Sequence, residues 1–291
     1  MIVKNIAFIG LGVMGYPMAG HLINKNNDLK INVYNRSIKK TENWISKFNG
    51  SLCNTPAEAA KDSEVVFICV GNDKDVEEVV KGKNGIMSSI SENTIIVDHT
   101  TASAKIALNL YQYCSSKNVS FIDAPVSGGQ AGAENGQLTI MVGGDEEAYL
   151  KIEPLLKSYA KNSTLIGNSG SGQLAKMVNQ ICIAGLLQGL SEAINFGQKV
   201  NLDMDKVINV IKDGAASSWQ MQNRHKTMAK NEFDFGFAVE WMRKDLKICL
   251  EQADEVGARL PITAIIDQFY SNILDIGGKR WDTSSLIKLL R

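Results

Sequence analysis

Residues 6–19 read IAFIGLGVMGYPMA, and this stretch decides the fold. The apolar run Asn5 to Ile9 leads directly into a glycine-rich turn, after which apolar residues recur at helical spacing. In a Gly-X-Gly-X-X-Gly pattern the first glycine permits a tight turn, the second lets backbone approach a pyrophosphate, and the third allows close helix packing. Strand, turn and helix in this order predict a dinucleotide site. Its candidate cofactor-binding residues are Gly10, Leu11, Gly12, Val13, Met14 and Gly15.

The next apolar run, Lys30 to Tyr34, ends where an NAD enzyme carries an acidic residue for the ribose 2′-hydroxyl. This chain has Asn35, Arg36 and Ser37 instead. A guanidinium can bind a 2′-phosphate through two hydrogen bonds, a serine adds a hydroxyl, and no carboxylate repels the phosphate. We therefore expect NADP(H) to be preferred, with NAD(H) as the alternative. In the competing interpretation Ser37 only caps the following helix and Arg36 is solvated.

Two further apolar runs, one ending at Val70 and one covering Thr94 to Val97, predict strands buried on both faces. Ligands of doubly wound sheets bind beyond the carboxyl ends of the strands, so Val70 and Thr101 are candidate cofactor contacts. Capping of the next helix by Thr101 or Ser103 is an equally open interpretation. His99 has no metal-ligand spacing, and we expect no metal site.

A further strand, interrupted by Pro125, is predicted from Ser120 to Val126, followed by Ser127, Gly128 and Gly129. Successive small residues can expose backbone N–H groups that bind an anion, although such a stretch is more often a plain loop. Strands alternate with helices up to Gly167. This alternation predicts a doubly wound, mainly parallel α/β sheet of the Rossmann type.

Helical periods dominate after Gly167. We expect a Rossmann domain that binds NADP over residues 1–167 and an all-helical domain for substrate binding and oligomerisation over residues 168–291. A long interdomain helix, Leu174 to Lys199, begins the second domain. The shorter helices are predicted at Met204 to Lys212, Ser217 to Ala229, Phe237 to Val256, Ile262 to Ile276 and Ser284 to Leu290.

Lys176 stands on the opening turns of the long helix, which is apolar on nearly all sides. Such a helix is usually buried. Burial and the helix macrodipole both lower the pKa of a lysine from about 10.4, which suits proton transfer. A lysine that extends its ammonium into solvent would have no such role.

The composition favours a small-molecule partner. Lysine and arginine together number 31, as do aspartate and glutamate, so no net charge attracts nucleic acid or an anionic membrane. The five cysteines are far apart and odd in number, which indicates reduced thiols and a cytoplasmic setting. No stretch predicts a signal peptide or a membrane span. We expect a soluble protein.

Four stretches together resemble the β-hydroxyacid dehydrogenase family, and the resemblance covers essentially the whole chain. The family includes 3-hydroxyisobutyrate dehydrogenase, tartronate semialdehyde reductase and glyoxylate/succinic semialdehyde reductase. The stretches are IAFIGLGVMGYPMA at 6–19, DAPVSGGQAGAENGQLTIMVGG at 123–144, GSGQLAKMVNQ at 170–180 and MRKDL at 242–246.

The resemblance implies that Lys176 is the general acid/base. Many relatives carry an asparagine four residues after this lysine, whereas here Asn179 is third and Gln180 is fourth, so the orienting role is open between them. The residues implied to bind the substrate are Ser127, Gly128, Gly129, Asn179 and Gln180.

The resemblance also implies that Thr101 and Lys244 approach the nicotinamide. Asp245 beside Lys244 is either a buried pairing partner or half of an exposed ion pair. We expect an NADP(H)-dependent oxidoreductase that interconverts a short-chain oxo-acid or semialdehyde and its hydroxy-acid by hydride transfer. It would resemble 3-hydroxyisobutyrate dehydrogenase or 2-hydroxy-3-oxopropionate reductase and form a homodimer or homotetramer.

Three alternatives remain open at this point. The enzyme could be a glyoxylate/succinic semialdehyde reductase, or a relative that oxidises serine with the same lysine. From a different class, the chain could be an NADP-binding module without turnover, because fold alone does not establish activity. A 6-phosphogluconate-type decarboxylase is disfavoured, because the helical domain is short and lacks a basic cluster for a sugar phosphate.

Overall fold

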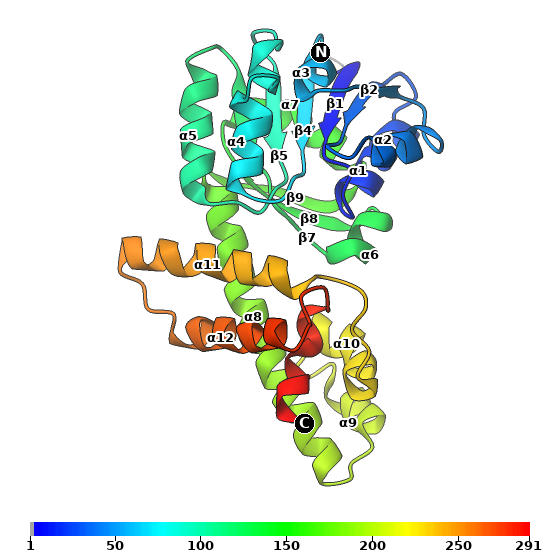
Figure 1. Ribbon diagram of the computed structural model, residues 1–291, viewed down its shortest axis with the longest axis vertical. Helices are drawn as coiled ribbons and strands as arrows, with labels where there is room; N and C mark the ends of the chain where they lie inside the picture. Colours follow the sequence, from blue (N-terminus) through cyan, green and yellow to red (C-terminus); the bar gives the residue numbers. More distant parts are fainter. Residues whose placement is uncertain (1–2) are drawn as a thin grey trace. The chain divides into compact units, whose positions relative to one another are not determined.

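A computed structural model gives the structure of residues 3–291, which form two compact units (Figure 1). The first unit ends at Lys176 and the second begins at Met177. The sequence places the boundary at Gly167. The difference arises because the first turn of α8 (Ser171–Lys199) is hydrogen-bonded to the sheet of the N-terminal unit, so it belongs to that unit.

One sheet forms the centre of the N-terminal unit. Its order is β3-β2-β1-β4-β5-β6-β8-β7, with β9 paired to β8. The first six strands are parallel, and the order reverses between β1 and β4, where doubly wound folds bind ligands. The strands are β1 (Asn5–Ile9), β2 (Lys30–Tyr34), β3 (Ser51–Leu52), β4 (Val65–Ile68), β5 (Ile95–Asp98), β6 (Ser120–Asp123), β7 (Val126–Ser127), β8 (Leu138–Gly143) and β9 (Ala160–Gly167).

Helices cover both faces of this sheet, as Figure 1 shows. Because side chains alternate along a strand, Val65 and Phe67 of β4 point to one core and Val66 and Ile68 to the other. The first core includes residues of α1, α2 and α7, and the second includes residues of α3, α4 and α5. The Rossmann-type prediction is confirmed. The helices are α1 (Gly15–Lys25), α2 (Ile38–Ile45), α3 (Pro56–Ala60), α4 (Asp73–Lys81), the 3₁₀ turn η1 (Ile86–Ser88), α5 (Ala104–Ser115), α6 (Gly129–Glu134) and α7 (Glu146–Leu156).

Side-chain caps fix where several of these helices begin. Thr55 Oγ1 accepts the amide of Glu58 at 3.0 Å before α3, and Asn72 Oδ1 caps α4 in the same way. Ser103 Oγ accepts the amide of Ile106 at 3.1 Å. Ser103, and not Thr101, is therefore the N-cap of α5.

The C-terminal unit is helical, as the sequence predicts. Its main core joins α8, α11 and α12 through Leu187, Leu246 and Tyr270. Within residues 3–291 no helix is both long enough and apolar enough to cross a membrane. The helices after α8 are α9 (Met204–Ile211), α10 (Trp219–Lys230), α11 (Val239–Val256), α12 (Pro261–Asp275) and the 3₁₀ segment η2 (Thr283–Leu290).

Two local features refine the expectations from the sequence. The strand expected from Ser120 to Val126, with an interruption at Pro125, is two strands, because β6 ends at Asp123 and β7 begins at Val126. Pro125 lies between them and has no N–H group to continue a ladder. The stretch after Ser127 also contains the short helix α6, which the run of small residues did not indicate.

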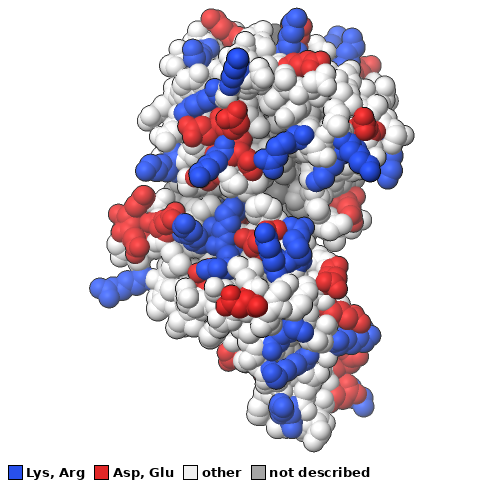
Figure 2. Space-filling model, in the orientation of Figure 1, with Lys and Arg blue, Asp and Glu red and all other residues white. Residues whose placement is uncertain are grey.

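Charged side chains of both signs intermingle over the face shown in Figure 2. Several form exposed pairs one helical turn apart, such as Lys151 with Glu147 at 2.7 Å and Lys157 with Glu153 at 2.9 Å. Solvent screens such pairs, so they contribute little to stability. The mixture agrees with the equal numbers of acidic and basic residues in the sequence.

Candidate functional site

The glycine turn between β1 and α1 has the geometry of a dinucleotide cradle. Gly10 has a φ of +101°, and its amide donates to Tyr34 O at 2.8 Å. A Cβ placed on Gly12 would meet no atom within 4 Å, so the backbone there faces open space. The residues present therefore fit a pyrophosphate next to the start of α1.

Asn35 supports this turn from the end of β2. Its Oδ1 accepts the amide of Leu11 at 2.9 Å, and its Nδ2 donates to Ser37 O at 3.1 Å. Asn35 thus stabilises the glycine turn between β1 and α1. Ser37 stands at the N-cap position of α2, but its side chain accepts no capping hydrogen bond from that helix.

Arg36 projects into solvent beside the turn. Its side chain is 87% exposed, and Nη1 lies 3.3 Å from Asp75 Oδ1 on α4. An exposed pair of this kind is weak, so a phosphate can replace the carboxylate as the partner of the guanidinium.

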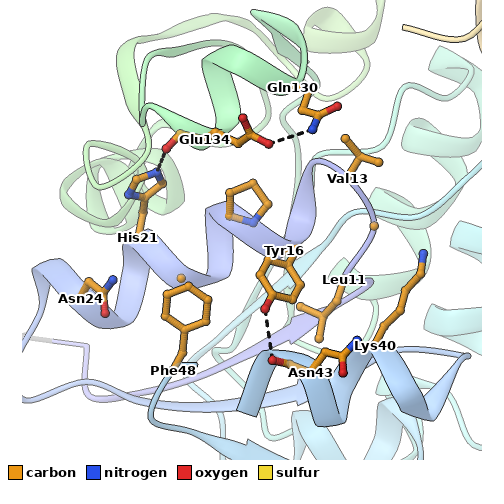
Figure 3. A pocket seen from close by; sticks show the side chains of 13 residues that line it. Leu11, Val13, Tyr16, His21, Asn24, Lys40, Asn43, Phe48, Gln130 and Glu134 are labelled. Atoms are coloured by element: carbon orange, nitrogen blue, oxygen red, sulfur yellow. Dashed lines mark hydrogen bonds between the residues drawn. The ribbon is translucent and has the colours of Figure 1, made fainter. Parts of the chain in front are cut away.

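A groove of about 530 Å³ runs from the glycine turn across α1, α2 and α6 (Figure 3). Gly12 and Lys40 both line it, and Tyr16 Oη donates to Asn43 O at 3.1 Å within it. Lys40 is a groove residue that the glycine motif and the end of β2 do not indicate. The signal was available, because Lys40 stands one helical turn after Ser37 and therefore on the same side of α2.

Polar groups gather where β4 and β5 end. The amide of Val70 donates to Thr100 Oγ1 at 3.0 Å, and the amide of Thr100 donates to Asp98 Oδ1 at 2.9 Å. Asp98 is buried, and burial raises the pKa of its carboxyl to about 7, despite hydrogen bonds from Thr100 that lower it. Thr101 follows this cluster directly.

His99 faces a different environment in the same region. Its ring nitrogens lie 2.7 Å from Ala124 O and 2.8 Å from Tyr159 Oη, and burial lowers the pKa of the ring to about 4. It is a neutral core side chain. Within residues 3–291 no group of three or more His, Cys, Asp or Glu side chains is arranged to hold a metal ion.

Ser127, Gly128 and Gly129 connect β7 to α6. Gly128 has a φ of +130° and Gly129 a φ of +62°, so the chain turns sharply through two left-handed residues. A Cβ on Gly129 would meet nothing within 4 Å. The backbone at this position can be approached closely by a small ligand.

Lys176 ends the N-terminal unit and is 7% exposed. The expectation of a buried lysine on the opening turns of α8 is confirmed.

A chain of polar contacts occupies the C-terminal unit next to the start of α8. Asn179 Nδ2 donates to Gln180 Oε1 at 2.8 Å, and Gln180 Nε2 donates to Asp245 Oδ2 at 2.6 Å. Lys244 Nζ lies 3.1 Å from Asp245 Oδ1, and Asp245 is buried. Asp245 is therefore a buried pairing partner. It joins Lys244 to the Asn179–Gln180 pair, a contact between α8 and α11 that sequence spacing does not reveal.

Comparison with known proteins agrees with this geometry. Residues 5–167 match the family described as the NAD binding domain of 6-phosphogluconate dehydrogenase, and residues 170–290 match the NAD-binding family of NADP-dependent 3-hydroxyisobutyrate dehydrogenase. The chain belongs to the β-hydroxyacid dehydrogenase family. It is an NAD(P)-dependent hydroxyacid dehydrogenase.

Relatives in this family match over nearly their full length. A Shewanella frigidimarina oxidoreductase is 52% identical over 98% of this chain and 97% of its own. The Escherichia coli 2-hydroxy-3-oxopropionate reductase is 33% identical over 98% of this chain and 96% of its own. The structure of Mycobacterium tuberculosis 3-hydroxyisobutyrate dehydrogenase with L-serine is similar, with a TM-score of 0.89 and 25% identity over all of both chains.

Asp98 makes the stability of this β-hydroxyacid dehydrogenase depend on pH. In the unfolded chain an aspartate has a pKa of about 3.9, whereas the folded pKa is about 7. The folded state therefore loses stability as the pH rises between these values, because the unfolded state ionises first. We expect Asp98→Asn to gain stability relative to wild type over this range, by a few kcal/mol in order of magnitude, and to show no further gain above about pH 7.

Urea unfolding of both proteins at several pH values measures this difference. Asp28→Asn provides the control, since Asp28 is exposed. A stability difference between Asp98→Asn and wild type that stays constant from pH 4 to about pH 8 would contradict the raised pKa.

Proposed function

We propose that this β-hydroxyacid dehydrogenase is an NADPH-preferring reductase that interconverts a short-chain oxo-acid or semialdehyde and its hydroxy-acid. The observation that carries the proposal is the buried position of Lys176 on the opening turns of α8. An ammonium withdrawn from bulk water interacts strongly with charge that develops on a carbonyl oxygen. Family membership supplies the reaction class in which such a group is needed.

When bound, NADPH supplies a hydride for the carbonyl carbon. Lys176 Nζ donates a proton to the carbonyl oxygen as the hydride arrives, so that negative charge does not accumulate there. The products are the hydroxy-acid and NADP⁺. In the oxidative direction the neutral amine of Lys176 accepts the hydroxyl proton.

Ser127, Gly128 and Gly129 would receive the substrate carboxylate through the serine hydroxyl and backbone amides. This assignment is supported by the open space next to the backbone of Gly129. Asn179 and Gln180 are hydrogen-bonded to each other, and Gln180 is bonded in turn to Asp245. We assign the orienting role to this pair.

The cofactor assignment rests on residues near the ribose. The glycine turn from Gly10 to Gly15 would hold the pyrophosphate, and Arg36, with Ser37 and Lys40, would bind the 2′-phosphate of NADP(H). Thr101 and Lys244 would contact the nicotinamide end of the cofactor. Val70 would contact the part of the cofactor between the pyrophosphate and the nicotinamide. These roles are supported by the open space at Gly12 and by the exposed guanidinium of Arg36.

The substrate class follows from the site and from the relatives. A small acid with an aldehyde or ketone close to the carboxylate would suit a site in which Lys176 acts on the carbonyl and Ser127 binds the carboxylate. The Escherichia coli relative is named 2-hydroxy-3-oxopropionate reductase, and the Mycobacterium tuberculosis structure contains L-serine. Glyoxylate, succinic semialdehyde and serine are therefore the alternatives to 3-hydroxyisobutyrate and 2-hydroxy-3-oxopropionate.

We also propose a homo-oligomer formed through α8. In the C-terminal unit one side of this helix exposes Val178, Cys182, Gly189 and Phe196 at helical spacing. Phe196 is 66% exposed. A Cβ on Gly185 would lie 4.0 Å from the exposed Ile262 of α12, so the apolar surface continues onto a second helix. The exposed Glu192 also lies on this side of α8, between Gly189 and Phe196. A largely apolar surface of this kind suits a two-fold contact with a second copy.

Lys176→Ala is expected to lower kcat by about a hundred- to ten-thousand-fold, because the general acid is lost. Dinucleotide binding should persist, since the glycine turn is intact. The assay follows NADPH oxidation with glyoxylate, succinic semialdehyde and 2-hydroxy-3-oxopropionate, and NADP⁺ reduction with 3-hydroxyisobutyrate and serine. Lys199→Ala, an exposed lysine on the same helix, is the control. Full activity in Lys176→Ala would refute the role of this lysine.

Arg36→Ala is expected to weaken NADPH binding about ten- to a hundredfold, the range for loss of a charged hydrogen bond. NADH binding should change little, because NADH has no 2′-phosphate. Fluorescence titration with both cofactors measures the effect, and Lys39→Ala on the exposed side of α2 is the matched control. Equal weakening of both cofactors would count against NADP selectivity through Arg36.

Phe196→Glu is expected to dissociate the oligomer, because a buried unpaired carboxylate opposes apolar contact. Sedimentation velocity at micromolar concentration compares it with wild type, and Glu147→Gln on α7, whose side chain is 85% exposed, serves as the control. A wild-type protein that sediments as a monomer would refute the proposed contact.

A further inference from the structure

The first turn of α8 is attached to the sheet by a buried carboxylate from another element. Asp123, the last residue of β6, accepts the amide of Gly170 at 2.7 Å through Oδ1 and the amide of Gln173 at 3.0 Å through Oδ2. The first amides of a helix have no partner within it and carry a partial positive charge. One carboxylate therefore holds two donors at the start of the helix that carries Lys176.

The approach between these segments is close enough to require glycine. A Cβ on Gly172 would lie 2.5 Å from Met141 O and 2.6 Å from Asp123 O. A Cβ on Gly143 would lie 2.7 Å from Asp123 Oδ1 and also 2.7 Å from the amide of Gly172. Such distances leave no room for any side chain. The helix start is thus seated against β6 and β8 with little freedom to shift.

Gln173 makes a second attachment from the same turn. Its Oε1 accepts the amide of Ala102 at 3.0 Å, and its Nε2 donates to Thr100 O at 2.8 Å. These two backbone groups lie on either side of Thr101, and Gln173 is 1% exposed. Both ends of its amide are therefore used to fix the backbone around Thr101.

Lys176 lies three residues after Gln173, one helical turn further along α8. A rotation of the helix start by one residue would turn Lys176 about 100° away from its present direction. The general acid and the loop assigned to the nicotinamide end are consequently held by the same pair of side chains. General acid catalysis depends steeply on such placement, because misplacement by about 1 Å can cost a hundredfold in rate.

We propose that Asp123 and Gln173 are positioning residues that set Lys176 against the backbone around Thr101 for proton transfer. This proposal rests on the proposed function, since it assigns the placement of the same general acid. Neither residue is proposed to contact the reacting atoms. They affect the reaction only by fixing the position of Lys176.

Asp123→Asn tests the proposal, because asparagine keeps one acceptor oxygen and presents an N–H₂ group to the second amide. We expect kcat to fall at least about tenfold, while the Kd for NADPH stays within about twofold because the glycine turn is untouched. Hydrogen exchange at Gly170 and Gln173 should accelerate. Asp203→Asn, which changes the exposed N-cap of α9, should alter none of these values.

A double-variant comparison separates positioning from a purely structural role. In the Lys176→Ala background the further change Asp123→Asn should reduce the residual rate by less than about twofold, because the group it positions is gone. A structural role predicts a similar loss in both backgrounds. Gln173→Met, which keeps side-chain length without either hydrogen bond, provides a second variant with the same expectations for kcat.

The outcomes distinguish this proposal from the proposed function. A wild-type protein that turns over none of the substrates would refute the proposed function, and unchanged hydrogen exchange in Asp123→Asn would refute the attachment itself. If exchange accelerates in Asp123→Asn and Gln173→Met while wild-type activity is retained, the positioning role is wrong. An equal loss in both backgrounds would also overturn it.

Discussion

The parallel hydrogen-bond ladder from β1 to β6 is the constraint on which the N-terminal unit depends. Its register aligns Ile9 with Ile68, Ile68 with Asp98 and Asp98 with Asp123 in one row across the sheet. Because these strands run in the same direction, their carboxyl ends share one edge. The glycine turn, the loop after Asp98 and the attachment of α8 to Asp123 all follow from that shared edge.

The same row changes from apolar to acidic as it crosses the sheet. Ile9 and Ile68 are ordinary core residues, whereas Asp98 and Asp123 are buried carboxyls. Burial raises the pKa of both, and amide hydrogen bonds act in the opposite direction. Buried carboxyls are tolerated only where donors meet them. Here the amides of Thr100, Gly170 and Gln173 donate to these carboxyls. The backbone is therefore held in place at the carboxyl edge of the sheet, where the reaction is proposed to occur.

Local sequence signals were sufficient for most of the fold. The strand, glycine turn and helix at 5–25 have the spacings typical of a dinucleotide-binding start, and buried strands such as β4 and β5 are visible as continuous apolar runs. Short-range chemistry also indicated Ser103 as one of two candidates for the cap of α5. It did not reveal α6, since a helix of small residues has no apolar period to detect.

The site itself was only partly visible in the sequence. Lys176 was identified because an isolated charge in an apolar helix is conspicuous, and the structure buries it. The partners that organise the region were not visible, because they come from distant parts of the chain: Asp245 meets Gln180 across 65 positions, and Asp123 meets Gln173 across 50. Such pairs depend on how elements pack, which residue spacing does not encode.

The raised pKa of Asp98 also couples cofactor binding to proton uptake by this carboxyl. Its pKa of about 7 means that near neutral pH a substantial fraction of the folded molecules carry the proton and a substantial fraction do not. The dinucleotide proposed to bind at this edge of the sheet would raise that pKa further, since negative charge disfavours ionisation of a carboxyl. Cofactor binding would then take up protons from the medium. The heat measured by calorimetry will include the ionisation enthalpy of the buffer, and two buffers at one pH will give different apparent binding enthalpies.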